Sequence, residues 1–262
     1  MKIPSTLKIR LLFSGFCIAI LFSTCKKYEQ VTVPDNNAPY YDQVATVLVK
    51  NYINRLFIDL IGREPLNTEM NANVQFLRDS HLSIAAREQL ITHLQKDTTY
   101  IPGDSSYMYA YYNRFYELCK ARVLQAASDD DLRLFAGFAR VIALDDSLRG
   151  DFLGMSLYKN EEKKCLDVIK TQTDYRIGGI EIKDVFGRMI NNSRYDNFNM
   201  GSVNFLNGTF NDLFSRFPIK QPAGTCEFDL GYTMINFNQP AVLFGKSGQN
   251  KGDYVQILVN SQ

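Results

Sequence analysis

The sequence is poor in the side chains that most often carry out catalysis or bind metals. It contains only two histidines, His81 and His93, and their spacing does not place them on one helix face as a zinc-binding pair requires. No serine lies in a Gly-x-Ser-x-Gly segment, and no cysteine lies near a histidine. The sequence alone therefore indicates no catalytic group, no metal and no cofactor.

An excess of charge of either sign is also missing. The chain has 29 Lys and Arg residues against 28 Asp and Glu residues, a net charge of +1. A protein that binds nucleic acid usually has a basic excess, because it neutralises phosphates with Lys and Arg. We therefore expect no nucleic-acid partner.

Cysteine is scarce, and only Cys119, Cys165 and Cys226 follow residue 25. Their spacing fits neither a metal-binding knuckle nor covalent haem attachment, since the chain has no Cys-x-x-Cys-His segment. We expect these three cysteines to be buried and unpaired, as small apolar side chains are. The alternative is one disulfide, which would leave an odd thiol.

Long apolar runs are absent after the N-terminus. The run Leu11–Phe22 follows basic residues and is too short to cross a bilayer, which is typical of a secretory signal peptide. It ends in Leu-Phe-Ser-Thr-Cys25, which resembles a bacterial lipobox. We interpret residues 1–24 as a lipoprotein signal peptide and Cys25 as the lipidated residue. The alternative is an ordinary cleaved signal with Cys25 as an incidental thiol.

The polar segment 25–39 carries two prolines and is interpreted as a tether to the membrane. Lipid on Cys25 would place the protein in the cell envelope, on the periplasmic face or the outer surface. Residues 40–262 are then enough for one helical domain with one core, or for two small domains that share an interface.

A sixteen-residue segment occurs twice, as Tyr52–Asn67 and Phe205–Lys220, and the copies align without a gap. In each copy, apolar residues at helical spacing form one stripe. An arginine then follows in the last turn and a proline two residues later, which predicts that the helix ends there. The identical pairs are Asn54/Asn207, Phe57/Phe210, Asp59/Asp212, Leu60/Leu213, Arg63/Arg216 and Pro65/Pro218.

The sequence therefore predicts a mainly α fold, an irregular helical bundle with two copies of a helix–Arg-x-Pro motif around one core in an approximate two-fold arrangement. We expect Phe57, Leu60, Phe210 and Leu213 to be buried. Asp59 with Arg63, and Asp212 with Arg216, have the spacing of ion pairs within a helix. The alternative is that Asp59 and Asp212 meet across the repeat as paired carboxylates capable of acid–base chemistry.

The segment from Tyr52 to Leu94 resembles a known family. It reads Asp-Leu-Ile-Gly-Arg63-Glu-Pro65, a helix ending in Phe76-Leu77, and then Ala86-Arg-Glu-Gln-Leu-Ile91. This order is similar to the opening of an uncharacterised helical domain of planctomycete envelope proteins, which often accompanies c-type cytochrome modules; similar lipoproteins occur in Bacteroidota. The resemblance implies a helical envelope domain without assigned chemistry. It does not imply electron transfer here, because the haem motif is missing.

Further helices are indicated by periodicity and capping residues. Aromatic side chains cover two faces of one of them, Tyr107–Ala126, which indicates either burial on both sides or a platform for sugars or peptides. Ser128 and Asp131 form a capping box before another. The expected helices are 40–61, 68–78, 83–97, 107–126, 132–148, 152–171, 180–190 and 201–215, and residues 232–237 form a short helix or a strand.

The C-terminal segment leaves two questions open. The Gly-rich stretch with Lys246, Ser247 and Lys251 is either an anion-binding loop or a flexible surface loop. The apolar stretch Tyr254–Val259 either packs into the core or belongs to a C-terminally shortened domain. Shortening predicts an exposed apolar patch around Phe244, Ile257 and Leu258.

Two classes of function are compatible with these features. The first is a non-catalytic envelope lipoprotein that binds a protein or glycan partner or acts as an assembly subunit. The second is an enzyme or redox accessory whose site is formed only by the fold. A pocket that gathers Asp59, Arg63, Asp212, Arg216, Lys246 and the face of Tyr107 and Tyr111 would favour the second.

Overall fold

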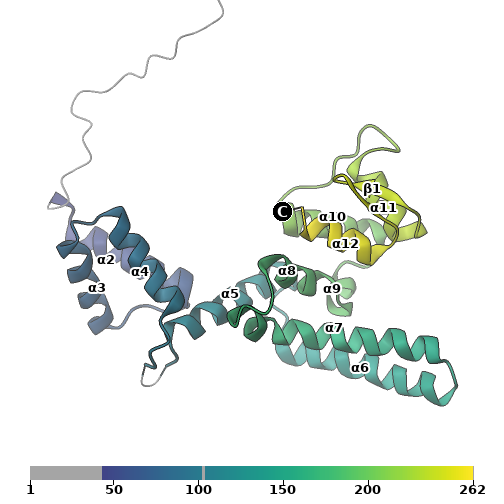
Figure 1. The fold of residues 1–262 in the computed structure, drawn as a ribbon, viewed down its shortest axis with the longest axis horizontal. Coiled ribbons are helices and arrows are strands. Elements are labelled where there is room, and N and C mark those ends of the chain that lie inside the picture. The colour runs from purple at the N-terminus through teal and green to yellow at the C-terminus, as the bar shows by residue number, and fades with distance from the viewer. Residues whose placement is uncertain (1–42, 102–103, 262) are drawn as a thin grey trace, which may run out of the picture. The chain divides into compact units, whose positions relative to one another are not determined.

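A computed structural model describes residues 43–101 and 104–261 and confirms the mainly α fold (Figure 1). The predicted signal peptide, the tether and Cys25 lie outside the described residues. Among the residues described, no helix is both long and apolar enough to cross a membrane.

The first copy of the repeat begins a group of three helices. Helix α2 (Thr46–Leu56) ends in a π-helical turn η2 (Phe57–Ile61), followed by α3 (Asn67–Asp79) and α4 (Ile84–Lys96). Together with the start of α5 (Tyr107–Val123) they enclose one apolar core. Phe57 lies in this core with no exposed surface, as expected, while Leu60 is only half-buried.

The second copy belongs to a different core. It forms α10 (Ser202–Phe214), which packs with α11 (Glu227–Phe237) and α12 (Lys251–Val259). The end of α5 and helix α8 (Ile182–Ile190) line the same core. Phe210 is fully buried there and Leu213 half-buried. The expectation that both copies pack around one core is therefore wrong: each copy is covered by the helices that follow it.

Helix α5 contributes to both cores, and this explains its two aromatic faces. Tyr107 packs in the first core, while Tyr116 and Cys119 pack in the second. The burial interpretation of these aromatics is confirmed at those positions, whereas Tyr109 and Leu118 remain exposed. Cys119, Cys165 and Cys226 are buried and free, as predicted.

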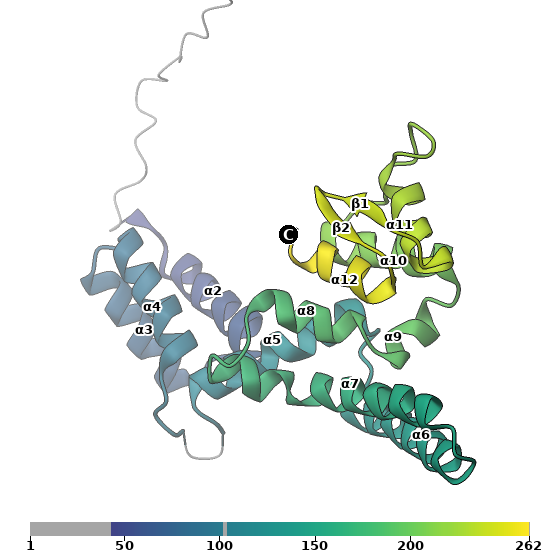
Figure 2. The same cartoon turned by 45° about the vertical axis from the view of Figure 1, so that its right-hand side comes forward.

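In the sequence, a helical hairpin of α6 (Asp129–Leu148) and α7 (Phe152–Arg176) lies between the two copies. The two helices lie side by side in both views (Figures 1 and 2). The predicted capping box is present: Ser128 Oγ accepts a hydrogen bond from the Asp131 N–H at 3.0 Å, and Asp131 accepts one from the Ser128 N–H. The short helix α9 (Ser193–Phe198) then leads into α10.

The C-terminal part is more regular than the sequence suggested. The stretch 232–237 belongs to α11. The Gly-rich stretch is a β-hairpin of β1 (Ala241–Leu243) and β2 (Lys246–Gly248), joined by Phe244 and Gly245. Both joining residues have positive φ, as a two-residue type I′ turn requires.

Helix α12 fills the second core. Tyr254, Val255 and Leu258 are fully buried and Ile257 nearly so. The patch of exposed apolar residues expected around Phe244, Ile257 and Leu258 is therefore wrong; among these three, only Phe244 reaches solvent.

Candidate functional site

The two Arg-x-Pro motifs do not form the expected ion pairs. Asp59 pairs instead with Arg55, at 2.7 Å, on an exposed part of α2 and η2. Asp212 accepts a hydrogen bond from the Tyr195 hydroxyl at 2.9 Å. The arginines turn away from these aspartates because each follows a residue with left-handed backbone, Gly62 in the first copy and Ser215 in the second.

In the first copy, Arg63 joins the end of one helix to the start of the next. Its guanidinium donates two parallel hydrogen bonds to the Glu69 carboxylate, both at 2.8 Å. The same carboxylate accepts the Leu66 N–H at 2.6 Å and the Tyr107 hydroxyl at 2.6 Å. Arg63 also lies 5.7 Å from the centre of the Phe57 ring, and Asp104 accepts its Nε–H at 2.7 Å.

The second copy repeats this arrangement with equivalent residues. Arg216 donates two hydrogen bonds to Glu227, at 2.6 and 2.7 Å, and lies 5.2 Å from the centre of the Phe210 ring. Glu227 accepts the Ile219 N–H at 2.8 Å, as Glu69 accepts that of Leu66. We call each arrangement an arginine clasp: Arg63 with Glu69, and Arg216 with Glu227.

The clasps show that the repeat continues past the prolines. Glu69 lies three residues after Leu66, whereas Glu227 lies eight residues after Ile219, so the second copy carries five extra residues in the loop. An alignment without gaps misses this. In the first copy Glu69 lies in the first turn of the next predicted helix, but in the second copy the predicted element 232–237 starts after Glu227, so the sequence carried no matching signal there.

In each clasp the arginine and the carboxylate pair with each other, and their hydrogen bonds shift the pKa of the carboxylate. Burial favours a raised pKa for Glu69, but hydrogen bonds from Arg63 and Tyr107 outweigh it and lower that pKa to about 2. The hydrogen bond from Arg216 likewise lowers the pKa of Glu227. Each arginine is thus neutralised by a carboxylate and links two helices rather than facing a ligand.

The paired-carboxylate hypothesis is also wrong. Asp59 lies in η2, whose buried residues belong to the first core. Asp212 lies on α10 of the second core and contacts Tyr195. Burial raises the pKa of Asp212, although the hydrogen bond from Tyr195 acts the other way. The residues named for a fold-formed active site do not gather in one pocket of the described structure.

The residues of the possible anion-binding loop are dispersed as well. Lys246 lies on β2, and its Nζ donates a hydrogen bond to the Asn260 carbonyl at 2.8 Å. A cation at this place stabilises the C-terminal end of α12 through the helix dipole. Lys251 begins α12 and pairs with Asp196, and Ser247 is exposed on β2. Because both lysines have partners within the fold, the structure does not bring these residues together as an anion site.

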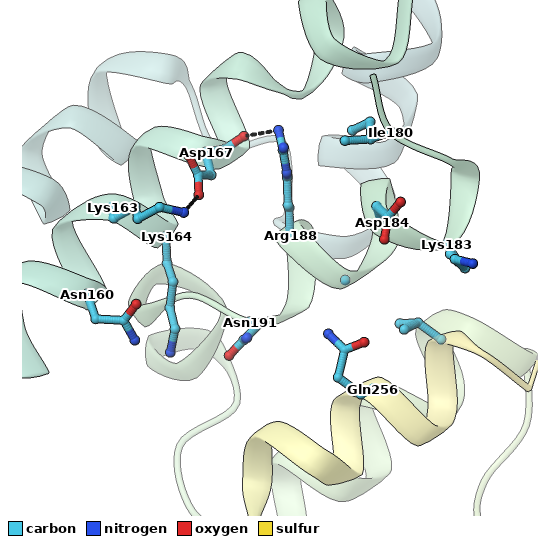
Figure 3. Close-up of a pocket in the computed structure, with 12 residues that line it drawn as sticks. Asn160, Lys163, Lys164, Asp167, Ile180, Lys183, Asp184, Arg188, Asn191 and Gln256 are labelled. Carbon is cyan, nitrogen blue, oxygen red and sulfur yellow. Dashed lines mark hydrogen bonds and ion pairs between the residues drawn. The ribbon is translucent and has the colours of Figure 1, made fainter. Parts of the chain in front are cut away.

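An open cleft of about 590 Å³ lies between α7, α8 and α12 (Figure 3). Four cations line it, but each pairs with a carboxylate, for example Arg188 with Asp174 at 2.6 Å and Lys164 with Glu161 at 2.6 Å. Three side-chain amides, Asn160, Asn191 and Gln256, also border the cleft. It offers hydrogen-bond donors and acceptors to a polar ligand without a concentrated charge.

The most unusual surface is on α6, where large apolar side chains face solvent. Leu134, Val141 and Leu148 are exposed, Leu148 by 88%. The opposite side of α6, which packs on α7, carries Leu132 and small residues such as Ala136 and Ala143. A surface helix normally buries its large apolar residues and exposes polar ones. The apolar pattern on this side of α6 could be found in the sequence. That no other described element covers it could be learned only from the structure.

Similarity to known proteins does not identify the site. The chain matches no protein-family model, no curated protein and no solved structure. Among the described residues, no group of three or more His, Cys, Asp or Glu side chains is arranged to hold a metal ion.

Proposed function

We propose that this protein is a non-catalytic lipoprotein of the cell envelope that acts as a binding or assembly subunit through the α6–α7 hairpin. Lipid on Cys25 anchors the chain, and the solvent-facing apolar side of α6 contacts a protein partner. The observation that carries the proposal is that apolar side of α6.

A single exposed apolar residue is normal on a protein surface, but a contiguous group marks an interaction site. On α6 the exposed apolar residues recur along the whole helix, and Phe152 and Leu153 extend them onto the first turn of α7. A protein partner fits this surface better than a glycan, because burial of such side chains against other apolar groups is favourable at about 25 cal/mol per Å².

The anchor is supported by the sequence before the described residues. A short apolar run leads to Ser-Thr-Cys25, and a polar tether follows. Acyl chains on Cys25 would supply the membrane anchoring, so the protein contact on α6 does not have to hold the subunit at the membrane.

A charge substitution on α6 tests the proposal. We express the full chain in bacterial membranes, extract it in mild detergent and measure the mass of its complexes for wild type and Val141→Glu. The matched control is Val47→Glu on α2, since Val47 and Val141 are exposed to a similar extent, 60% and 64%.

We expect wild type and Val47→Glu to migrate in a complex, and Val141→Glu to lose it while retaining its helical circular dichroism. If wild type extracts as a single chain, or if Val141→Glu leaves the complex intact, α6 is not the binding surface.

A further inference from the structure

The exposed apolar residues of α6 follow a heptad. Leu134, Gly137, Val141, Leu144 and Leu148 are spaced by three and four residues in alternation, which is the pattern of the a and d positions of a coiled coil. All five are exposed, and a side chain added at Gly137 would meet open space. We call these five residues the α6 seam.

The residues that face α7 follow a second heptad on the opposite side. They are Leu132, Ala136, Ala139, Ala143 and Asp146, all buried. Helix α6 therefore has two packing faces, and the structure fills only one. The small residues on the filled face let α7 approach closely, whereas the larger residues lie on the α6 seam.

Charged residues flank the α6 seam at positions where opposite charges of two parallel copies would meet. With Leu134, Val141 and Leu148 at a, Arg140 lies at a g position and Asp145 at the following e position. In a parallel two-stranded coiled coil, a g residue faces the next e residue of the partner helix. Arg140 is exposed and forms no ion pair within residues 43–101 and 104–261, so it is available to a second copy. Asp145 is exposed and pairs with Arg149 of its own chain at 2.8 Å, so Arg140 of another copy would share or replace that surface pair.

We propose that the α6 seam binds the α6 seam of a second copy of this chain, in parallel orientation, so that the two α6 helices pack against each other and the two α7 helices lie on their outer sides. This inference rests on the proposed function and names its partner. Leu134, Val141 and Leu148 each meet the same residue of the second copy, and Arg140 pairs with Asp145 across both sides of the two-fold axis.

Other arrangements fit the charges less well. An antiparallel pair would place Asp131 against Asp145, and Arg140 against Arg140 of the other copy, where like charges repel. An anionic lipid surface is also disfavoured, because α6 carries five aspartates, two arginines and no lysine.

The α6 seam spans about two heptads, which is short for an isolated coiled coil. Here α7 already holds α6 in its helical conformation, so binding does not have to induce the helix.

Disulfide crosslinking at the two ends of the seam distinguishes the orientations. We replace Leu134, Leu144 or Leu148 by cysteine in the full chain, treat membranes with copper phenanthroline, which oxidises adjacent thiols, and run non-reducing gels. The unsubstituted chain measures any background from its own cysteines. Leu48→Cys, at an exposed leucine of α2, is the matched control.

A parallel pair yields a dimer band with Leu134→Cys alone and with Leu148→Cys alone, at least five-fold above Leu48→Cys. The antiparallel register described above places Leu134 opposite Leu144, so a dimer only when Leu134→Cys and Leu144→Cys are co-expressed means an antiparallel pair and overturns the proposal. Crosslinking to a protein of another mass would also overturn it, yet would leave the proposed binding function intact. Absence of any crosslink, together with a single-chain mass in detergent, overturns both.

A charge reversal provides a second measurement. Arg140→Glu places like charges opposite Asp145 of the second copy and should reduce the dimer band of Leu148→Cys, and adding Asp145→Arg should restore it. If Arg140→Glu has no effect, or if the double variant stays as weak, the parallel register is wrong.

Discussion

Individual side chains show which parts of the repeat are structural. Phe57 and Phe210 occupy equivalent positions, are fully buried, and each lies beneath the guanidinium of a clasp arginine. The carboxylates of Glu69 and Glu227 complete the same contacts from the following helix. The identical Phe and Arg residues of the repeat are therefore explained by helix-to-helix connection, whereas the identical Asp59 and Asp212 have different partners.

Removal of either phenylalanine should destabilise the core that contains it. We expect Phe57→Ala and Phe210→Ala each to lower the free energy of unfolding by about 3–5 kcal/mol, as large-to-small substitutions in a core do. Urea titration followed by circular dichroism measures this. An effect below about 1 kcal/mol at either position would contradict the packing described for that core.

The clasp of Glu69 predicts how stability depends on pH. Its pKa is about 2 in the folded chain against an ordinary value of 4.5, so the ionised form is stabilised by folding. This contribution is fully present above about pH 4.5 and is lost as the pH falls towards 2. Glu69→Gln should therefore be less stable than wild type at pH 7, with a difference that shrinks at pH 3.

Urea midpoints at pH 7 and pH 3 measure this difference. Glu88→Gln, at an exposed position of α4, is the control and should leave the midpoint at pH 7 nearly unchanged. A Glu69→Gln deficit that is the same at both pH values would mean that the clasp does not depend on the charge of the carboxylate.

At the scale of elements, α6 is the helix whose two faces have different roles. Its c and f positions pack on α7, and its a and d positions face solvent. The helix is also fixed at its start, where Ser128 and Asp131 satisfy backbone N–H groups that no helical carbonyl reaches. The proposed binding surface therefore depends on a well-formed helix.

The capping box should be measurable in the stability of the hairpin. Ser128→Ala removes the acceptor for the Asp131 N–H, and we expect it to cost about 1 kcal/mol. Ser147→Ala, at an exposed position of the same helix, is the control and should be neutral within about 0.5 kcal/mol. Equal midpoints for the two variants in urea would show that the cap does not stabilise α6.

At the scale of the whole molecule, each repeat begins a group of three helices with its own core. The groups are α2 with its π-helical end, α3 and α4, and then α10, α11 and α12. Helix α5 contributes side chains to both cores, and the α6–α7 hairpin lies between the groups in the sequence. The second group includes a β-hairpin where the first has a short turn before its third helix.

The proposed membrane anchor belongs to this scale, because it concerns the whole chain. We expect a fatty-acid analogue supplied to growing cells to label the wild-type chain and not Cys25→Ser, and the variant to leave the membrane fraction. Cys119→Ser, at a buried position, is the control and should be labelled as wild type is. Equal labelling of wild type and Cys25→Ser would exclude lipid at this residue.

The sequence by itself predicted eight of the helices with most of their ends, the buried Phe57 and Phe210, the free buried cysteines and the capping box at Ser128, but not α9, α12 or the start of α11. These features depend on side chains within about four residues of each other, or on how apolar a residue is. Only the tertiary structure decided which carboxylate each arginine binds, because Glu69 and Glu227 reach the arginines across loops of different length. It also separated the two copies into two cores and left one apolar face of α6 uncovered. A helix that is apolar on two sides can bury either, and the choice depends on which other helices the chain places beside it.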